Sequence, residues 1–204
     1  MYASLIALAA AANGFSLPHA GIELANYIQR HAPKSVDREG LWTVTEVEVF
    51  VDPKGKILEC ALKRVAGDME LAKALCSISV GQQISAPRDF ASLPVHAASR
   101  MILTAFPDYK PNPAGQLGGV ENERLEISLQ SAPKGAPTIP LVGLRLLIDA
   151  NGFVSSCEVV TEVSTELKSV ACQQASVQRW PAKLSKAKLP VPYIKTLVVE
   201  FASA

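Results

Sequence analysis

The residues with the clearest chemical meaning in this chain are its four cysteines, Cys60, Cys76, Cys157 and Cys172. None of them belongs to a Cys-x-x-Cys pair, the close spacing that holds structural zinc or forms a thioredoxin-like redox centre. An even number of widely spaced cysteines is instead typical of disulfides in an exported protein. Four cysteines allow three pairings, and buried free cysteines are a common alternative. The pairing therefore depends on the elements that carry them.

Other residues with catalytic or metal-binding chemistry are few and scattered. The chain has three histidines, and none stands at ligand spacing from a cysteine or an acid: His19, His31 and His96. The segment 149–152 begins like a calcium loop but lacks the later ligands. No Gly-x-Ser-x-Gly nucleophile motif is present. Glu46 and Glu48 share a face of a predicted strand, where charges usually meet solvent. The sequence predicts neither an enzyme nor a cofactor.

Charge and hydropathy narrow the class of protein further. The 204 residues include 20 Lys and Arg against 19 Asp and Glu, and 49% of the chain is hydrophobic. Binding to nucleic acid needs a clustered basic excess, which is absent, so no nucleic-acid partner is predicted. The length suits one large domain or two small ones with packed cores.

The N-terminus, Met1 to Ala20, resembles a secretory signal. A short apolar run, Leu5 to Ala12, precedes small residues and a proline. The usual positive charge before the run is missing, so a buried helix is the alternative. The run is far shorter than the ~20 residues that span a bilayer. We expect residues 1–20 to be a signal peptide and the protein to be exported and not membrane-spanning.

The chain contains an internal repeat. Four blocks of its first half recur in the same order and at a nearly constant offset in its second half: Val51–Cys60 with Ile148–Cys157, Leu71–Cys76 with Leu167–Cys172, Leu93–Val95 with Leu189–Val191, and Met101–Phe106 with Thr196–Phe201. Repeated blocks indicate repeated structural units.

Each copy has the same predicted elements. In the first copy, alternating valines up to Val51 predict a strand with one buried face, and Asp52 to Gly55 predicts a turn. A returning strand over 57–65, a helix over 70–79 with an apolar stripe and a final strand over 97–106 follow. The second copy repeats this order, with Asn151-Gly152 as its hairpin turn. The predicted fold class is α+β, two tandem ββαβ units, each a small antiparallel sheet covered by one helix.

The repeat favours one cysteine pairing. Cys60 lies on the second strand and Cys76 on the helix that packs against it, and Cys157 and Cys172 repeat this placement. We therefore predict the disulfides Cys60–Cys76 and Cys157–Cys172. In the chain-entropy model, closing a loop of ~15 residues contributes about 3 kcal/mol.

The predicted domains follow from these elements. Residues 21–106 form the first unit with an N-terminal helix near 20–32, and residues 141–204 form the second unit. The segment 107–140 is rich in proline and glycine, as a linker is. Within it, Leu125, Ile127 and Leu129 alternate with polar residues and predict an extra strand.

One segment of the second unit adds a family resemblance. A hairpin with a glycine turn, a helix, Trp180-Pro181-Ala182, then Pro-Val and a last apolar strand resemble the TonB C-terminal domain. The resemblance covers 141–201 well. It covers 43–106 more weakly, where Ile84-Ser85-Ala86-Pro87 replaces Trp-Pro-Ala.

The resemblance implies a periplasmic domain that binds a protein or an extended peptide segment, such as that of an outer-membrane transporter, by strand addition. It also implies which strand receives the partner: the final one, with Tyr193, Lys195, Leu197, Val199 and Phe201, and less clearly 99–106. Two units without an anchor or a long spacer differ from an energy transducer and favour a binding role.

Besides an enzyme whose deep pocket would hold perturbed acids or a histidine, the sequence leaves one alternative open, an assembly role. The protein is then a structural or assembly protein whose two units close on each other or on a second copy, as a homodimer. That alternative predicts that the edge strands are used up by the units themselves.

Overall fold

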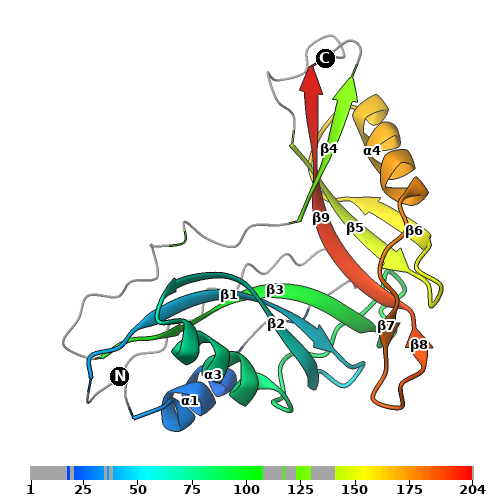
Figure 1. Ribbon diagram of the computed structural model, residues 1–204. Coiled ribbons are helices and arrows are strands. Elements are labelled where there is room, and N and C mark those ends of the chain that lie inside the picture. Colours follow the sequence, from blue (N-terminus) through cyan, green and yellow to red (C-terminus); the bar gives the residue numbers. More distant parts are fainter. Residues whose placement is uncertain are drawn as a thin grey trace. The chain divides into compact units, whose positions relative to one another are not determined.

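The computed structural model describes residues 18, 21–34, 36, 39–107, 117, 123–129 and 141–203 of the chain (Figure 1). It is a mixed α+β protein whose chain divides into two compact units, residues 1–121 and 122–204. The predicted signal segment, apart from Pro18, and most of the predicted linker lie outside the described residues.

The described part of unit 1 holds two α-helices and three strands. In chain order they are α1 (Ile22–His31), β1 (Thr43–Val51), β2 (Ile57–Gly67), α3 (Met69–Ser79) and β3 (His96–Ala105). β1 is the central strand, since it pairs antiparallel with β2 on one side and with β3 on the other. The hairpin, the helix and the last strand lie close to their predicted bounds.

Both helices of unit 1 cover the same face of its sheet (Figure 1). Leu24 and Ile28 of α1 join Leu71 and Leu75 of α3 in one apolar cluster with the β-strands. Asp68 begins α3, because its side chain accepts a hydrogen bond from the backbone N–H of Leu71 at 2.7 Å. The N-terminal helix is thus part of the core.

The other face of β1 is also covered, which differs from the expectation of one buried face. Every residue of β1 is buried except Glu48, which is half-buried. The alternation of valine with polar residues indicates a strand correctly, but it does not report whether the polar face meets water.

The described part of unit 2 holds one α-helix and six strands. They are β4 (Arg124–Leu129), β5 (Leu141–Ile148), β6 (Val154–Val159), α4 (Thr165–Val177), β7 (Lys183–Leu184), β8 (Pro190–Val191) and β9 (Tyr193–Ser203). β5 pairs antiparallel with β6 and with β9, and β7 pairs with β8 in a separate two-stranded ladder.

The extra strand predicted in the linker exists and belongs to unit 2. β4 pairs with β9 in parallel, so the sheet of this unit is mixed and not purely antiparallel as predicted. Alternating side chains predict a strand but carry no information about its direction, which explains the error.

Each unit has a hairpin turn of the same kind, and the segment that follows the helix is hydrogen-bonded to this turn. The carboxylates of Asp52 and Asp149 each accept two backbone N–H bonds across the hairpin turn. Gly55 follows at a φ of +89° and accepts a 2.8 Å hydrogen bond from the backbone N–H of Ile84. Gly152, at +88°, accepts the equivalent bond from Trp180 at 2.9 Å. Ile84 is therefore the structural counterpart of Trp180.

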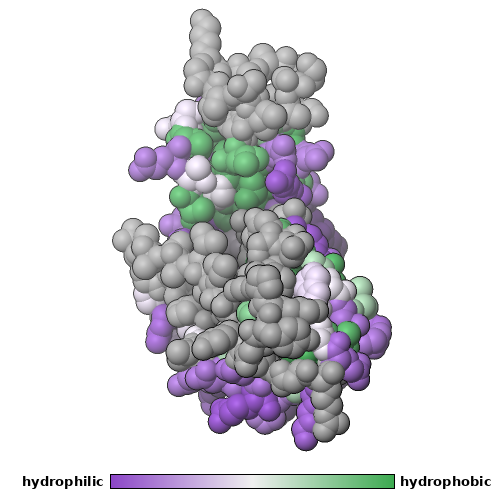
Figure 2. All heavy atoms as spheres, turned by 90° about the vertical axis from the view of Figure 1, so that its left-hand side faces the viewer, coloured by the Kyte–Doolittle hydropathy of each residue, from purple (hydrophilic) through white to green (hydrophobic). Residues whose placement is uncertain are grey.

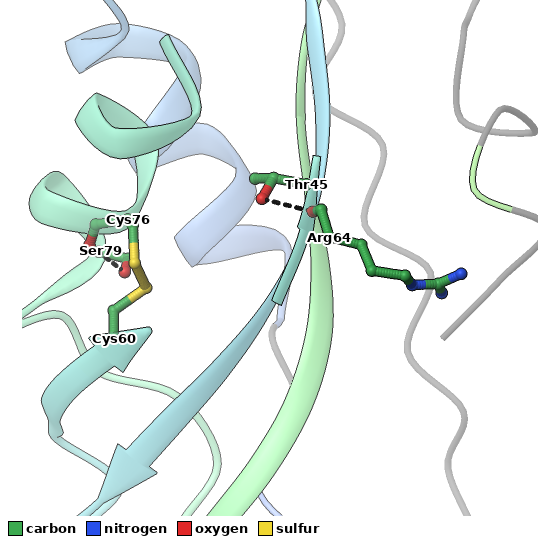
Figure 3. The surroundings of a disulfide bond; sticks show 5 residues. All are labelled: Thr45, Cys60, Arg64, Cys76 and Ser79. Carbon is green, nitrogen blue, oxygen red and sulfur yellow. Dashed lines mark hydrogen bonds between the residues drawn. A yellow bond between two sulfur atoms is a disulfide. The ribbon is translucent and has the colours of Figure 1, made fainter. Parts of the chain in front are cut away.

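Both predicted disulfides are present in the structure. Cys60–Cys76 joins β2 to α3 and Cys157–Cys172 joins β6 to α4, with Cα–Cα distances of 5.6 and 5.8 Å. Figure 3 shows the first disulfide beside Ser79, whose hydroxyl donates to the carbonyl of Cys76 at 2.7 Å. Each disulfide fastens a helix to the outer strand of its hairpin.

Candidate functional site

The last strand, β9, was predicted to receive a partner, and its neighbours are now defined. β5 pairs with it over Tyr193–Glu200. On its other side, β4 pairs with it from Val198 to Ser203. This last half of β9 is therefore an inner strand, and an added strand there must take the place of β4.

The five side chains predicted on β9 face the core of unit 2. Cys157 reaches α4 through its disulfide, and it lies opposite Leu146, which in turn lies opposite Lys195. Residues directly opposite in a sheet share a face. The α4 side of β9 therefore carries all five, and all are buried: Tyr193, Lys195, Leu197, Val199 and Phe201. A partner at this strand meets its backbone first, not these side chains.

The parallel pairing of β4 has a defined register. The backbone N–H of Val198 donates to the carbonyl of Glu123 at 2.8 Å, just before β4 begins. Leu125 then lies opposite Val199, and Ile127 lies opposite Phe201. Leu125 and Ile127 are half-buried and extend the α4 side of the sheet.

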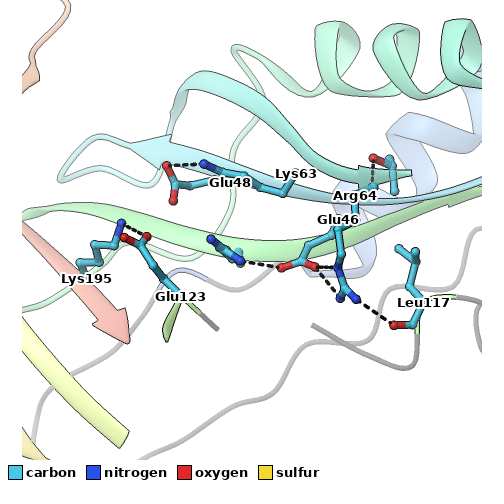
Figure 4. Close-up of polar contacts among 9 residues, drawn as sticks. Glu46, Glu48, Lys63, Arg64, Leu117, Glu123 and Lys195 are labelled. Atoms are coloured by element: carbon cyan, nitrogen blue, oxygen red, sulfur yellow. Dashed lines mark hydrogen bonds and ion pairs between the residues drawn. The ribbon is translucent and has the colours of Figure 1, made fainter. Parts of the chain in front are cut away.

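A buried lysine fixes the start of this register. The ammonium group of Lys195 lies 2.5 Å from a carboxylate oxygen of Glu123 (Figure 4). It also lies 5.3 Å from the ring centroid of Trp180, within the range of a cation–π contact. Only 8% of Lys195 is exposed, so these two contacts compensate for the loss of water around a charge.

A second charge pair lies on the opposite face of the same strands. A guanidinium nitrogen of Arg124 is 3.0 Å from a carboxylate oxygen of Glu200. Glu126 is directly opposite Glu200 in the register, so this face also places two acids across from each other. On the β5 side, Leu141 lies opposite Glu200, and 46% of Leu141 is exposed. Figure 2 shows hydrophobic surface on unit 2 with hydrophilic residues beside it.

The Trp-Pro-Ala segment has a structural role beside this site. Trp180 is buried, and its ring N–H donates to the carbonyl of Ala175 at the end of α4. The hydroxyl of Tyr193 donates to the carbonyl of Pro181 at 2.9 Å. The segment ties the end of α4 to the hairpin turn and to β9, and its tryptophan packs in the core.

Unit 1 holds a buried charge cluster that the sequence did not reveal. Glu46 was interpreted as part of a solvated strand face, but its side chain has no exposed surface. Arg64 contacts one of its carboxylate oxygens at 2.6 Å and Arg100 contacts the other at 3.3 Å. Glu48 pairs with Lys63 at 3.6 Å at the edge of this cluster (Figure 4). The cluster links the three strands of the unit and has the character of a structural network.

His96 is half-buried at the start of β3. Its ring stacks on Phe50, with 5.4 Å between centroids. Burial lowers the pKa of His96, and the nearby charge of Asp52 opposes that shift. Within the described residues, no group of three or more His, Cys, Asp or Glu is placed to hold a metal ion.

Described residues of unit 1 line hollows at its surface. One, of about 330 Å³, is lined by α1 and by Gln82 and Gln83 after α3. The other, of about 270 Å³, lies over the Cys60–Cys76 disulfide. Neither hollow has a histidine among its described lining residues.

Comparison with protein-family models, with curated proteins and with solved structures gives no match to this chain. None of the helices in the described residues is long and apolar enough to cross a membrane.

Proposed function

We propose that this protein is a non-catalytic periplasmic binding module that takes up an extended peptide segment of an envelope protein as an added strand on β9. One observation carries the proposal. β4, a segment outside the repeated elements, already lies along β9 as an extended strand in a defined parallel register. An edge that accepts this strand has the backbone geometry that strand addition requires.

The disulfides and the matching features of the two units support this role. Two disulfides are typical of an exported protein, because cytosolic thiols are kept reduced. We regard the two units as tandem copies of one ββαβ unit resembling the TonB C-terminal domain. The shared turn aspartates, the paired turn glycines and the equivalent disulfides support this view.

The test uses the full oxidised chain and an extended peptide. The probe is a labelled peptide of residues 121–130, ENERLEISLQ, compared with a scrambled peptide of the same composition. Saturable binding of the first peptide alone, with amide NMR shifts confined to β9 and its neighbours, is the expected result. If the two peptides bind equally, or if the shifts fall elsewhere, strand addition at β9 is wrong.

The assembly alternative is favoured by a different observation. In the ladders of the described residues, β2 and β6 each pair with one neighbour, β1 and β5 respectively. A strand that pairs with one neighbour is a place where a second copy of the chain can add a strand. A concentration-dependent dimer in sedimentation velocity, weakened by proline within β2 or β6, supports assembly. A monomer across the same concentrations argues against it.

A further inference from the structure

We propose that β4 is a displaceable internal strand, and that the partner segment that replaces it carries a basic residue at the position of Glu126. This inference rests on the proposed function and adds the regulation and the partner chemistry of the same edge. The occupant is an extended segment that runs parallel to β9. It has an acidic residue at the position of Glu123 and a basic residue at the position of Glu126. Its residues at the positions of Leu125 and Ile127 are apolar.

β4 pairs with β9 over Arg124–Leu129, and its charged contacts lie at the beginning of this ladder. Glu123 contributes both its carbonyl, bonded to Val198, and its carboxylate, paired with Lys195. Arg124 adds the pair with Glu200. Loss of these charged contacts weakens the start of the ladder, and a strand opens locally where its stabilising contacts are lost. Charge at these two positions therefore controls whether the edge of β9 is open.

The same strand contains one unfavourable pair. Glu126 lies directly opposite Glu200, and like charges at directly opposite positions destabilise a sheet. The pair of Arg124 with Glu200 offsets part of this repulsion from a diagonal position. A segment that keeps the acidic residue at the Glu123 position and replaces Glu126 by lysine or arginine has both contacts favourable. Such a segment competes with β4 for the edge.

The side chains along the rest of the edge define the remaining positions. Leu125 and Ile127 lie opposite Val199 and Phe201 on the face that α4 covers, so the partner needs apolar residues there. The buried ammonium group of Lys195 requires an acidic residue at the start of the segment, since it pairs with Glu123 in the present structure. Parallel direction follows from the register of β4.

The first experiment measures whether β4 is displaceable. Hydrogen exchange of the 198–203 amides is compared in the wild-type chain, in Glu123→Lys, in Glu123→Gln and in Glu126→Lys, all without peptide. Glu123→Lys places two ammonium groups together, so we expect about tenfold faster exchange, with a smaller increase for Glu123→Gln. Glu126→Lys pairs with Glu200, so we expect about threefold slower exchange. Unchanged exchange in all three folded variants overturns the displaceable strand.

The second experiment tests the partner chemistry. Peptide 121–130 and its Glu126→Lys form are titrated into the full chain carrying Glu123→Gln. The lysine peptide is expected to bind about threefold more tightly, and Glu200→Gln is expected to remove this preference. Glu158→Gln serves as the matched control, because Glu158 pairs with Arg145 on β6 and β5, away from β4. A preference that survives Glu200→Gln overturns the predicted chemistry.

The two experiments separate the two proposals. If exchange in β9 is unchanged and the wild-type chain binds the peptide with amide shifts at 193–197, before the β4 ladder, the displaceable strand is wrong and the proposed function stands. If exchange rises in Glu123→Lys but no peptide binds to any variant, β4 is displaceable and the proposed function is overturned, together with the partner chemistry.

Discussion

Replacing Glu46 by glutamine is expected to destabilise unit 1 strongly, although glutamine has nearly the same shape. Glu46 has no exposed side-chain surface and accepts contacts from Arg64 at 2.6 Å and from Arg100 at 3.3 Å. Glutamine keeps one oxygen but removes the negative charge that both guanidinium groups face. Two positive charges then remain close together without the carboxylate between them.

The size of the effect follows from the burial of the three side chains. Breaking a fully buried ion pair by removing one partner costs about 3–5 kcal/mol. Here the side chains of Arg64 and Arg100 keep 27% and 20% of their surface exposed, so water solvates them in part after the change. We therefore expect a loss of about 2–3 kcal/mol in the free energy of unfolding.

Glu48→Gln is the matched control, two residues along the same strand. Glu48 pairs with Lys63 at 3.6 Å, and the lysine is 33% exposed, so the loss should be about 0.5 kcal/mol. Urea unfolding followed by circular dichroism measures both variants, and hydrogen exchange of β1 amides assigns the loss to unit 1. A loss below about 1 kcal/mol for Glu46→Gln, or equal losses for the two variants, refutes the reasoning.

Three further predictions concern stability. Cys60→Ala with Cys76→Ala should lower the free energy of unfolding by about 3 kcal/mol, measured in urea, and an unchanged midpoint contradicts the constraint from loop closure. Gly55→Ala should lower the free energy of unfolding clearly more than Gly81→Ala, although the two glycines have nearly the same φ. A Cβ at Gly55 would lie 2.2 Å from a carbonyl oxygen, while the atom nearest to a Cβ at Gly81 is 3.9 Å away. Equal losses would show that the close contact at Gly55 relaxes freely. Burial lowers the pKa of His96 below its usual 6.5, so the unfolded chain binds more protons than the folded chain near that pH. The free energy of unfolding should therefore fall as the pH drops through and below 6.5. His96→Phe should weaken this dependence, which melting temperatures at pH 5 and 8 measure.

Local patterns in the sequence predicted most of the strands and helices. The hairpins, the helices that follow them and the last strands all rest on local patterns, such as alternating apolar residues, turn aspartates and glycines, and a helical apolar stripe. Both disulfides were predicted because the same two positions of the repeat carry a cysteine. The equivalence of Ile84 with Trp180 was only loosely visible, since it depends on a backbone hydrogen bond to a turn glycine and not on a side-chain type.

The surroundings of these elements depend on long-range packing, which local patterns do not encode. The alternation in β4 predicted a strand, but its parallel direction and its place along β9 depend on backbone pairing far away in the sequence. The same alternation in β1 did not reveal that Glu46 is buried between two arginines from neighbouring strands. Period-two patterns define which side chains share a face. Which strand or side chain covers that face is set by long-range packing, and the candidate binding edge depends on that packing.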